Sequence, residues 1–256
     1  MFLDLFKLPH KRIARWRVTR VRIRRDQRRE VAILSTLLTM ARIQISARPT
    51  RRLQFHRAMP TINPDLIVEL SSEDELARVI AAEQIHREGS APALRVINAW
   101  RQHRELAALL PRPETTVTVG VAVQPDTFAK IHAAIGAPEL AEVPPDQDAK
   151  EFELIFDNGV LLDILTTKDP AGSGAIARYL SKFGEGIQQV EFECADVDLA
   201  TELLKQLAAQ TPVYPRARPG ANNTRINFYL VNIAGRQGPE KLLIELFERP
   251  STTAAH

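Results

Sequence analysis

Two successive segments in the second half of the chain repeat the same order of strand-like and helix-like patterns. The first begins with alternating apolar residues from Thr116 to Val123, enters a helix at Pro125 that is closed by Gly136, and ends in further strands. The second segment, from Ile187 to Glu248, follows the same order. Such a repeat constrains the fold because both segments must form the same supersecondary unit. The sequence therefore predicts two β-α-β-β-β modules.

The remaining boundaries follow from turn residues and apolar alternation. The predicted strands of the first module are 116–123, a short one near 140–143, 152–156 and 160–166, around a helix over 125–135. Those of the second module are 187–194, a short one near 212–214, 224–231 and 241–248, around a helix over 196–208. We predict modules at 113–170 and 184–250 within one domain at 113–250, followed by a tail at 251–256.

The N-terminal 60 residues differ from the rest in charge. They carry 16 Lys and Arg against three acids, Asp4, Asp26 and Glu30. We interpret 1–62 as a basic arm, which is disordered, is a targeting presequence, or binds nucleic acid or an anionic membrane surface. The apolar run at 31–40 is too short to span a bilayer. The single cysteine, Cys194, excludes an intramolecular disulfide, so we expect a cytoplasmic protein, or an organelle-matrix protein if the arm is a presequence.

Residues 63–112 return to a helical period. Ser72 and Glu75 have the spacing of a capping box, and an apolar stripe then runs to Gly89. A second apolar stripe ends at Pro111. We predict a hairpin of two helices joined around Gly89 and Pro92, connecting the arm to the C-terminal domain.

The strings Gly184-Glu-Gly-Ile-Gln-Gln-Val-Glu-Phe-Glu-Cys-Ala-Asp-Val-Asp198 and Lys241-Leu-Leu-Ile-Glu-Leu-Phe-Glu248 resemble a known family. It is the vicinal oxygen chelate (glyoxalase, bleomycin resistance and dioxygenase-like) superfamily, and the resemblance is nearest to its methylmalonyl-CoA epimerase-like members. The segments 117–126 and 160–165 fit the same pattern less sharply. The resemblance covers about 114–250 and implies an α+β fold in which the paired modules form an open, eight-stranded, glyoxalase-like cup.

The resemblance also implies a divalent metal inside the cup, held by side chains from the first and last strand of each module. The matching positions are Thr118, Asp163, Gln189 and Glu245, and Thr118 and Gln189 stand where the family usually has histidine. Apolar alternation places these four side chains on one face. Oxygen donors suit Mg²⁺ or Mn²⁺ better than Zn²⁺, although Co²⁺ and Zn²⁺ also remain candidates. The predicted metal ligands are Asp163, Gln189 and Glu245; no nucleotide cofactor is expected.

The strand at 224–231 offers further polar candidates. If its polar side chains face the cup, Arg225 and Asn227 bind a ligand together with Thr118, and Tyr229 donates a proton. The competing interpretation is a solvated outer face.

Two functions from different classes follow. The resemblance implies a metal-dependent isomerase, epimerase or lyase that acts on a small carbonyl or acyl-CoA substrate, with Glu245, Glu191 and Tyr229 as catalytic residues. The alternative is a non-catalytic, metal-free cup that binds a ligand or serves as a scaffold, since fold does not determine function. The expected partners are a small molecule and a second copy of the chain, with nucleic acid or membrane as a minor alternative through the arm.

Overall fold

The computed structural model describes residues 20–21, 62–110, 117–235 and 238–250. It contains the helices α2 (Pro64–Glu69), α3 (Glu75–Trp100), α4 (Arg104–Leu109), α5 (Pro125–Ala134), α6 (Ala175–Phe183) and α7 (Val197–Leu207). Its strands are β1 (Arg20–Val21), β2 (Thr118–Ala122), β3 (Lys150–Phe156), β4 (Leu161–Thr166), β5 (Gly186–Glu193), β6 (Arg218–Pro219), β7 (Arg225–Gly235) and β8 (Gly238–Glu248).

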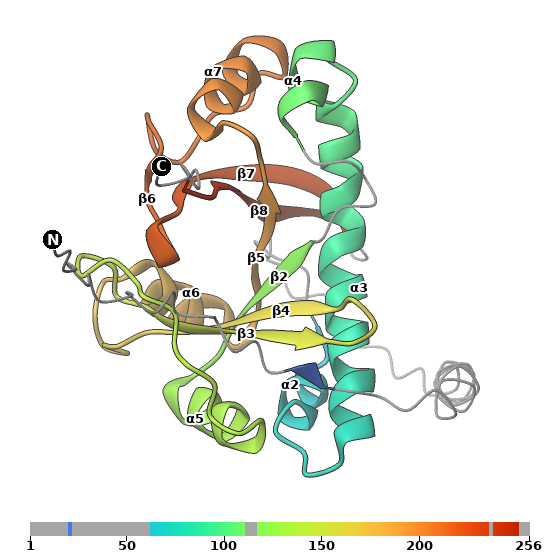
Figure 1. Cartoon of the computed structure of the whole chain (residues 1–256), viewed down its shortest axis with the longest axis vertical. Coiled ribbons are helices and arrows are strands. Elements are labelled where there is room, and N and C mark those ends of the chain that lie inside the picture. The colour runs from blue at the N-terminus through green and yellow to red at the C-terminus, as the bar shows by residue number, and fades with distance from the viewer. Residues whose placement is uncertain (1–19, 22–61, 111–116, 236–237, 251–256) are drawn as a thin grey trace, which may run out of the picture.

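The strands form a single sheet in the order β1-β3-β4-β2-β5-β8-β7-β6, curled into an open cup (Figure 1). At its centre β2 pairs antiparallel with β5. On either side of this pair the arrangement is the same, because β2 lies parallel to β4 and β5 lies parallel to β8. The predicted α+β class with a curled, open sheet is confirmed, with seven of the strands coming from residues 118–248.

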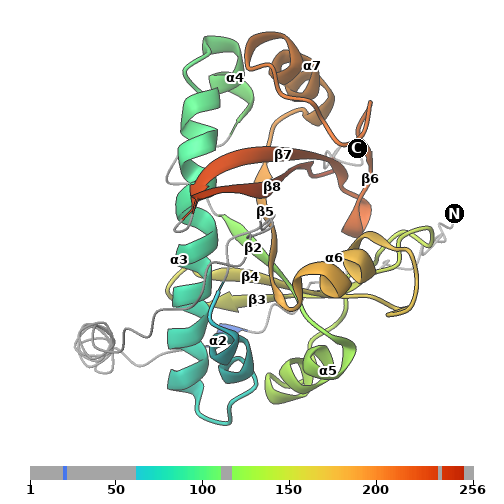
Figure 2. The ribbon, with the colours of Figure 1, turned by 180° about the vertical axis from the view of Figure 1, so that it is seen from behind.

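Helices α3, α5 and α7 cover the convex side of the sheet and its ends (Figures 1 and 2), whereas α6 packs against its concave face. Helix α5 begins as predicted, with Pro125 in its first turn, and packs on β4. Helix α7 begins at Asp196, whose side chain accepts a hydrogen bond from the Leu199 N–H, and packs on β7 and β8. Their apolar faces join the sheet and α3 in one hydrophobic core.

Three local predictions were wrong. Residues 140–143 form no strand, because the flanking segment is broken by Pro138 and Pro144 and only the Ala141 N–H reaches across to β3. The strand expected near 212–214 is reduced to one bridge between Pro212 and Tyr229, and the short strand β6 lies later in the chain. Helix α6, between the modules, was not predicted at all.

The predicted helical hairpin is instead one continuous helix. Helix α3 has 26 residues and passes through both Gly89 and Pro92. Its N-cap is Asp74, whose side chain accepts from the Leu76 N–H, rather than Ser72. Gly89 does not end the helix but permits its close approach to the sheet, since a Cβ there would lie 2.7 Å from Val119 Cγ1. Packing of α3 against β2 and β5 therefore outweighs the local breaker signals.

This contact gives a testable prediction for stability. Gly89→Ala gains about 1 kcal/mol of helix propensity. The added methyl group must displace the fully buried Val119, and overpacking of this kind costs about 1–3 kcal/mol. We expect a net loss of about 1 kcal/mol in the free energy of unfolding, measured by urea denaturation. The exposed control Arg87→Ala should change it by less than about 0.5 kcal/mol; a more stable Gly89→Ala would contradict the close packing.

Of the basic arm, only the backbone of β1 is described, where it pairs in parallel with the end of β3. The predictions of disorder, targeting and anion binding for the rest of 1–62 lie outside the described residues. None of the described helices has the length and apolar character that a membrane crossing requires.

Candidate functional site

The concave face of the sheet gathers a cluster of carboxyl and amide side chains. The register pairs Gly120 of β2 with both Asp163 of β4 and Gln189 of β5. It also pairs Glu191 of β5 with Glu245 of β8. Because directly paired residues point to the same side of a sheet, these side chains share one face. The four polar ones line a cavity of about 920 Å³.

Gln189 links two of these carboxyl groups. Its Nε2 donates to Glu191 Oε1 at 2.9 Å and to Glu245 Oε2 at 2.7 Å. Gly120 makes room for this arrangement, since a Cβ at that position would lie 2.6 Å from Gln189 Cγ. Three strands thus contribute to one hydrogen-bonded group, which we call the carboxyl cluster: Asp163, Gln189, Glu191 and Glu245.

The carboxyl cluster is buried, and no basic side chain among the described residues forms an ion pair with it. None of the ion pairs among the described residues involves Asp163, Glu191 or Glu245. Burial, opposed by hydrogen bonds from Gln189 and Asp163, raises the pKa of Glu191 to about 8. Burial and the neighbouring carboxylates raise the pKa values of Asp163 and Glu245 well above their ordinary range. Burial and mutual repulsion therefore favour the protonated forms of these carboxyl groups.

A fourth acid, on the strand next to β4, has a similar property. Glu151 of β3 lines the cavity, and its pKa is raised to about 7 by burial and by Glu153. Glu151 and Glu153 were not predicted as site residues from the sequence. They alternate with buried Phe152 and Leu154, and this period of two would have identified them.

Gln188 is a third residue that was not predicted. The register shifts between Gly120 and Val121, so that Val121 pairs with Ile187 and Gln188 is left as the extra residue of a bulge. Gln188 is 7% exposed and lines the cavity. Its Oε1 is buried without a hydrogen-bond partner. No simple alternation could have identified it, because a bulge interrupts the period.

The residues predicted on β7 lie outside the cup. The register of β7 and β8 pairs Phe228 with Glu245. Phe228 and Ile226 therefore point into the cavity, and the residues that alternate with them along β7 point away from it. Tyr229 is fully buried on the other side, where its hydroxyl lies 2.7 Å from Thr201 Oγ1 and its ring packs edge-on against Trp100.

The other two β7 candidates are engaged on the same outer side. Asn227 donates to the Tyr214 carbonyl, and Arg225 pairs with Asp198 at the start of α7. The expectation that Arg225, Asn227 and Tyr229 face the cup is therefore wrong, since α7 covers that side of the strand. Thr118 belongs to the concave face by register with Glu191, but it is buried and does not line the cavity.

The expected metal ligands do not fit a divalent cation in this arrangement. Gln189 directs its N–H groups, and not its oxygen, at Glu191 and Glu245. Thr118 supplies no imidazole. Among residues 62–110, 117–235 and 238–250, no three His, Cys, Asp or Glu side chains are grouped so as to hold a metal ion. The Gln189 amide instead occupies the position between the carboxyl groups.

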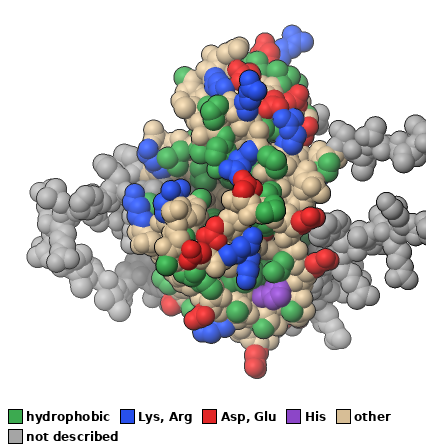
Figure 3. All heavy atoms as spheres, turned by 90° about the vertical axis from the view of Figure 1, so that its left-hand side faces the viewer, with side chains coloured by type: hydrophobic (Ala, Val, Ile, Leu, Met, Phe, Trp, Pro, Cys, Tyr) green, Lys and Arg blue, Asp and Glu red, His purple; other side chains and the backbone are tan. Residues whose placement is uncertain are grey.

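Loops from both halves of the chain meet at the mouth of the cup. Glu142 and Asn222 exchange two hydrogen bonds, from the Glu142 N–H to Asn222 Oδ1 at 3.0 Å and from the Asn222 N–H to the Glu142 carbonyl at 2.9 Å. Gln147 donates to the Pro219 carbonyl, and Arg218 pairs with Asp146. On the side of the molecule drawn in Figure 3, basic and acidic side chains are interspersed with apolar ones.

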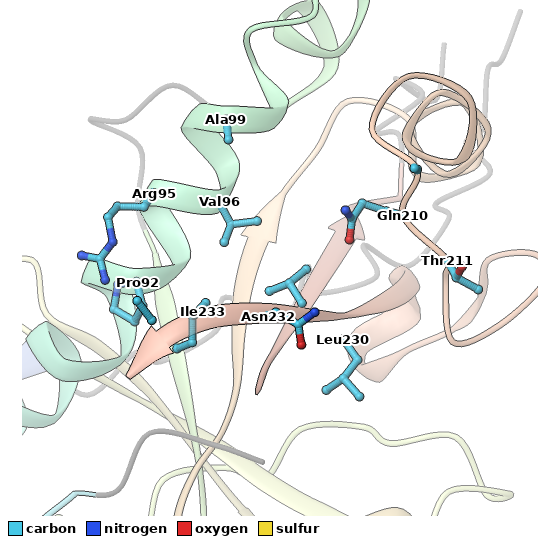
Figure 4. A pocket seen from close by; sticks show the side chains of 12 residues that line it. Pro92, Arg95, Val96, Ala99, Gln210, Thr211, Leu230, Asn232 and Ile233 are labelled. Carbon is cyan, nitrogen blue, oxygen red and sulfur yellow. The ribbon is translucent and has the colours of Figure 1, made fainter. Parts of the chain in front are cut away.

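A second hollow, of about 620 Å³, lies between α3 and β7 (Figure 4). Its walls are Pro92, Arg95, Val96 and Ala99 of α3, the 209–211 segment, and residues 230–234. It contains no carboxyl, imidazole or thiol group. The carboxyl groups with raised pKa values line the cup and not this hollow.

No family model matches the chain, and none of the curated proteins matches it. Solved structures do. The chain is similar to methylmalonyl-CoA epimerases. The enzyme from Mycobacterium tuberculosis is 29% identical with a TM-score of 0.41, covering 54% of this chain and 90% of that one. The Streptomyces coelicolor epimerase in complex with 2-nitronate-propionyl-CoA is 22% identical with a TM-score of 0.40, covering 52% and 96%.

A hypothetical protein from Bacillus halodurans C-125 is 19% identical with a TM-score of 0.42, covering 54% of this chain and 98% of that one.

The raised pKa values predict how stability depends on pH. The pKa of Glu191 is about 8 in the folded protein and 4.5 ordinarily, so folding retains a proton that the unfolded chain releases between these values. The resulting stabilisation is complete below the lower value and lost as pH rises through the upper one. We expect the free energy of unfolding to fall by about 4 kcal/mol between about pH 5 and pH 9. Urea denaturation at several pH values measures it.

Glu191→Gln removes one titrating group while keeping its shape, and should make this pH profile less steep, while Glu151, Asp163 and Glu245 still contribute to it. The exposed control Glu139→Gln should retain the wild-type profile. A wild-type stability that stays constant or rises over the same interval would contradict the proposed burial of protonated carboxyl groups.

Proposed function

We propose that the cup catalyses proton transfer at the carbon α to the carbonyl group of a small carbonyl or acyl-CoA substrate, as an isomerase or epimerase. The observation that carries this proposal is Glu191, a carboxyl group that faces a large cavity with a pKa of about 8. A base whose pKa lies near the operating pH is suited to proton transfer. The acyl-CoA class comes from the sequence resemblance.

In the forward step, Glu191 takes the α-proton and the C–H electron pair moves onto the carbonyl oxygen, giving an enolate. Asp163 is a candidate for stabilising that oxygen, since burial beside other carboxyl groups raises its pKa and favours the protonated form, which can donate a hydrogen bond. Gln189 holds the Glu191 carboxylate in place through its Nε2. In this proposal the steps use only side chains of the chain and no metal ion.

Epimerisation also requires a proton from the opposite face of the planar enolate. Glu151 supports this role because it lines the same cavity from β3, which β4 and β2 separate from β5, and its pKa of about 7 leaves it partly protonated at neutral pH. Return of a proton from Glu151 inverts the configuration at the α-carbon, whereas return of the proton from Glu191 restores the original configuration.

The alternative function is a non-catalytic, metal-free cup that binds a ligand. It is favoured by Thr118 and Gln189, which stand where the resembling family has histidine. Both functions use the same cavity, so they differ in chemistry and not in location.

Deuterium exchange separates the two. The full-length protein is incubated with methylmalonyl-CoA in D₂O, and NMR follows loss of the C2 proton against a protein-free sample. Exchange well above that background supports the proton-transfer function. Binding of the thioester without accelerated exchange would support the non-catalytic alternative, and absence of binding would remove the acyl-CoA class.

A further inference from the structure

The cavity of the cup is lined by more acids than bases. Among the described residues, eight acids and three arginines line it. Two of the arginines are already paired with acids, and the third, Arg178, is exposed. The most buried acids, Asp163 and Glu245, form none of the ion pairs found in the described part of the chain. The charge of the cavity therefore favours a cation over an anion.

Gln188 is an independent sign that a hydrogen-bond donor belongs in this cavity. It lines the cavity, is 7% exposed, and its Oε1 is buried without a hydrogen-bond partner. Buried acceptors without a partner are costly and rare in folded proteins, so such an atom indicates a partner that is supplied from outside the chain. Because an amide oxygen accepts hydrogen bonds and donates none, that partner is an N–H or O–H group.

The fold holds Gln188 beside the carboxyl cluster. The register shift between β2 and β5 makes it the extra residue of a bulge, and bulges redirect side chains at functional sites. Before it, Ile187 is fully buried, and its carbonyl accepts from the Tyr179 hydroxyl at 2.7 Å. After it, Gln189 is bonded to two carboxyl groups. Both neighbours are fixed, so the position of Gln188 in the wall is fixed as well.

The walls of the cavity also indicate the shape of a ligand. On the side of β3, Glu151 and Glu153 line the cavity, and these carboxyl groups present acceptor oxygens whether they are ionised or protonated. On the side of β7 and β8, the lining residues Phe228, Leu243 and Phe247 are apolar. A ligand that fits both sides has an apolar body and a donor head group.

We propose that Gln188 Oε1 and the surrounding carboxyl groups bind the ammonium group of an amine that has an apolar body. A primary ammonium group carries three donors and no acceptor, so it can bond to Gln188 and to carboxyl oxygens together. Its charge also favours the ionised form of any acid that it contacts. The site binds such a ligand whether or not proton transfer follows. Where proton transfer follows, the inference rests on the proposed function and makes the preferred substrate a carbonyl compound that carries an amino group.

Three ligands with the same apolar body and different head groups test this ammonium site. Phenylbutylamine is a cation at neutral pH, phenylbutanol is neutral, and phenylbutyrate is an anion. Each is titrated into the full-length protein by calorimetry at neutral pH. We expect the wild type to bind the amine about tenfold more tightly than the alcohol, as a charge-assisted contact implies, and to bind phenylbutyrate more weakly than either.

Variants at Gln188 locate the contact. Gln188→Leu removes the acceptor and should remove most of the preference for the amine. Since Gln188 Oε1 makes no hydrogen bond within the described residues, its loss should leave the fold intact. Gln188→Glu keeps an acceptor and adds negative charge, so it should retain or increase the preference. The control Glu105→Gln, exposed on α4 and outside the cavity, should bind all three ligands as the wild type does.

Equal binding of the amine and the alcohol by the wild type would overturn the ammonium site. Tighter binding of phenylbutyrate, or binding of none of the three ligands, would overturn it too. A preference for the amine that persists in Gln188→Leu would also contradict it, because the contact would then not involve Gln188. Deuterium exchange tests the proposed function separately, so each of these results would leave that function standing.

Discussion

Glu191→Gln is expected to lower the rate of α-proton exchange by about 100-fold to 10,000-fold, the usual contribution of a positioned general base. Glutamine keeps the shape of the side chain and can still bond to Gln189, but it cannot accept a proton. The measurement is the initial rate of C2 deuteration of methylmalonyl-CoA in D₂O. The affinity for the thioester should change much less than the rate, because the substitution removes a group that acts on the reacting proton.

The pH dependence gives the same experiment a second readout. With a pKa of about 8, Glu191 is mostly protonated at neutral pH, so the wild-type rate should rise with pH and level off above that value. The matched control is Glu139→Gln at the rim of the cavity, which should keep both the rate and the profile. If Glu191→Gln retained the wild-type rate, the base would have to be another acid of the cup, with Glu151 the first to examine.

Sequence periodicity was sufficient to predict which side chains face the cup where the helix-covered face of a strand is apolar and the other face is polar. On β5 and β8, alternation correctly put Gln189, Glu191 and Glu245 together on the concave face. On β7 it failed because the side chains that face the cup, Ile226 and Phe228, are apolar, whereas Asn227 and Tyr229 on the helix-covered side are polar. Phe228 lines the cavity while Tyr229 is buried against Thr201 and Trp100, so polarity alone does not reveal which set points inward.

Other features depend on tertiary contacts that leave little trace in the sequence. Gly89 was interpreted as the end of a helix, whereas the close approach of α3 to Val119 is its structural reason. Helix α6 was missed although Ile176, Leu180 and Phe183 have helical spacing, because the Gly-rich segment before it resembles a loop. The unpartnered amide of Gln188 results from a register shift between β2 and β5, which only the three-dimensional pairing reveals.

The second prediction concerns the position that Gln189 occupies in the carboxyl cluster. The double variant Thr118→His, Gln189→His is expected to bind Co²⁺ or Zn²⁺ with a dissociation constant below about 10 µM, whereas the wild type should remain above about 1 mM. The variant removes the amide N–H groups that hold Glu191 and Glu245. It also adds two imidazoles on the face that already carries Asp163 and Glu245, so nitrogen and carboxylate donors converge. Calorimetry and the visible spectrum of bound Co²⁺ measure the gain.

Adding Glu245→Ala to the double variant is the control, and it should abolish the gained affinity because it removes one carboxylate donor. Micromolar metal binding by the wild type would show that Gln189 turns its oxygen inward, and proton transfer would then have to be reconsidered with a cation in the cup. A double variant that stays folded but binds no metal would mean that Thr118 lies too deep in the sheet for its side chain to reach Asp163 and Glu245. If the double variant gains metal binding and the wild type shows none, the result supports a cluster in which the Gln189 amide group has replaced the cation.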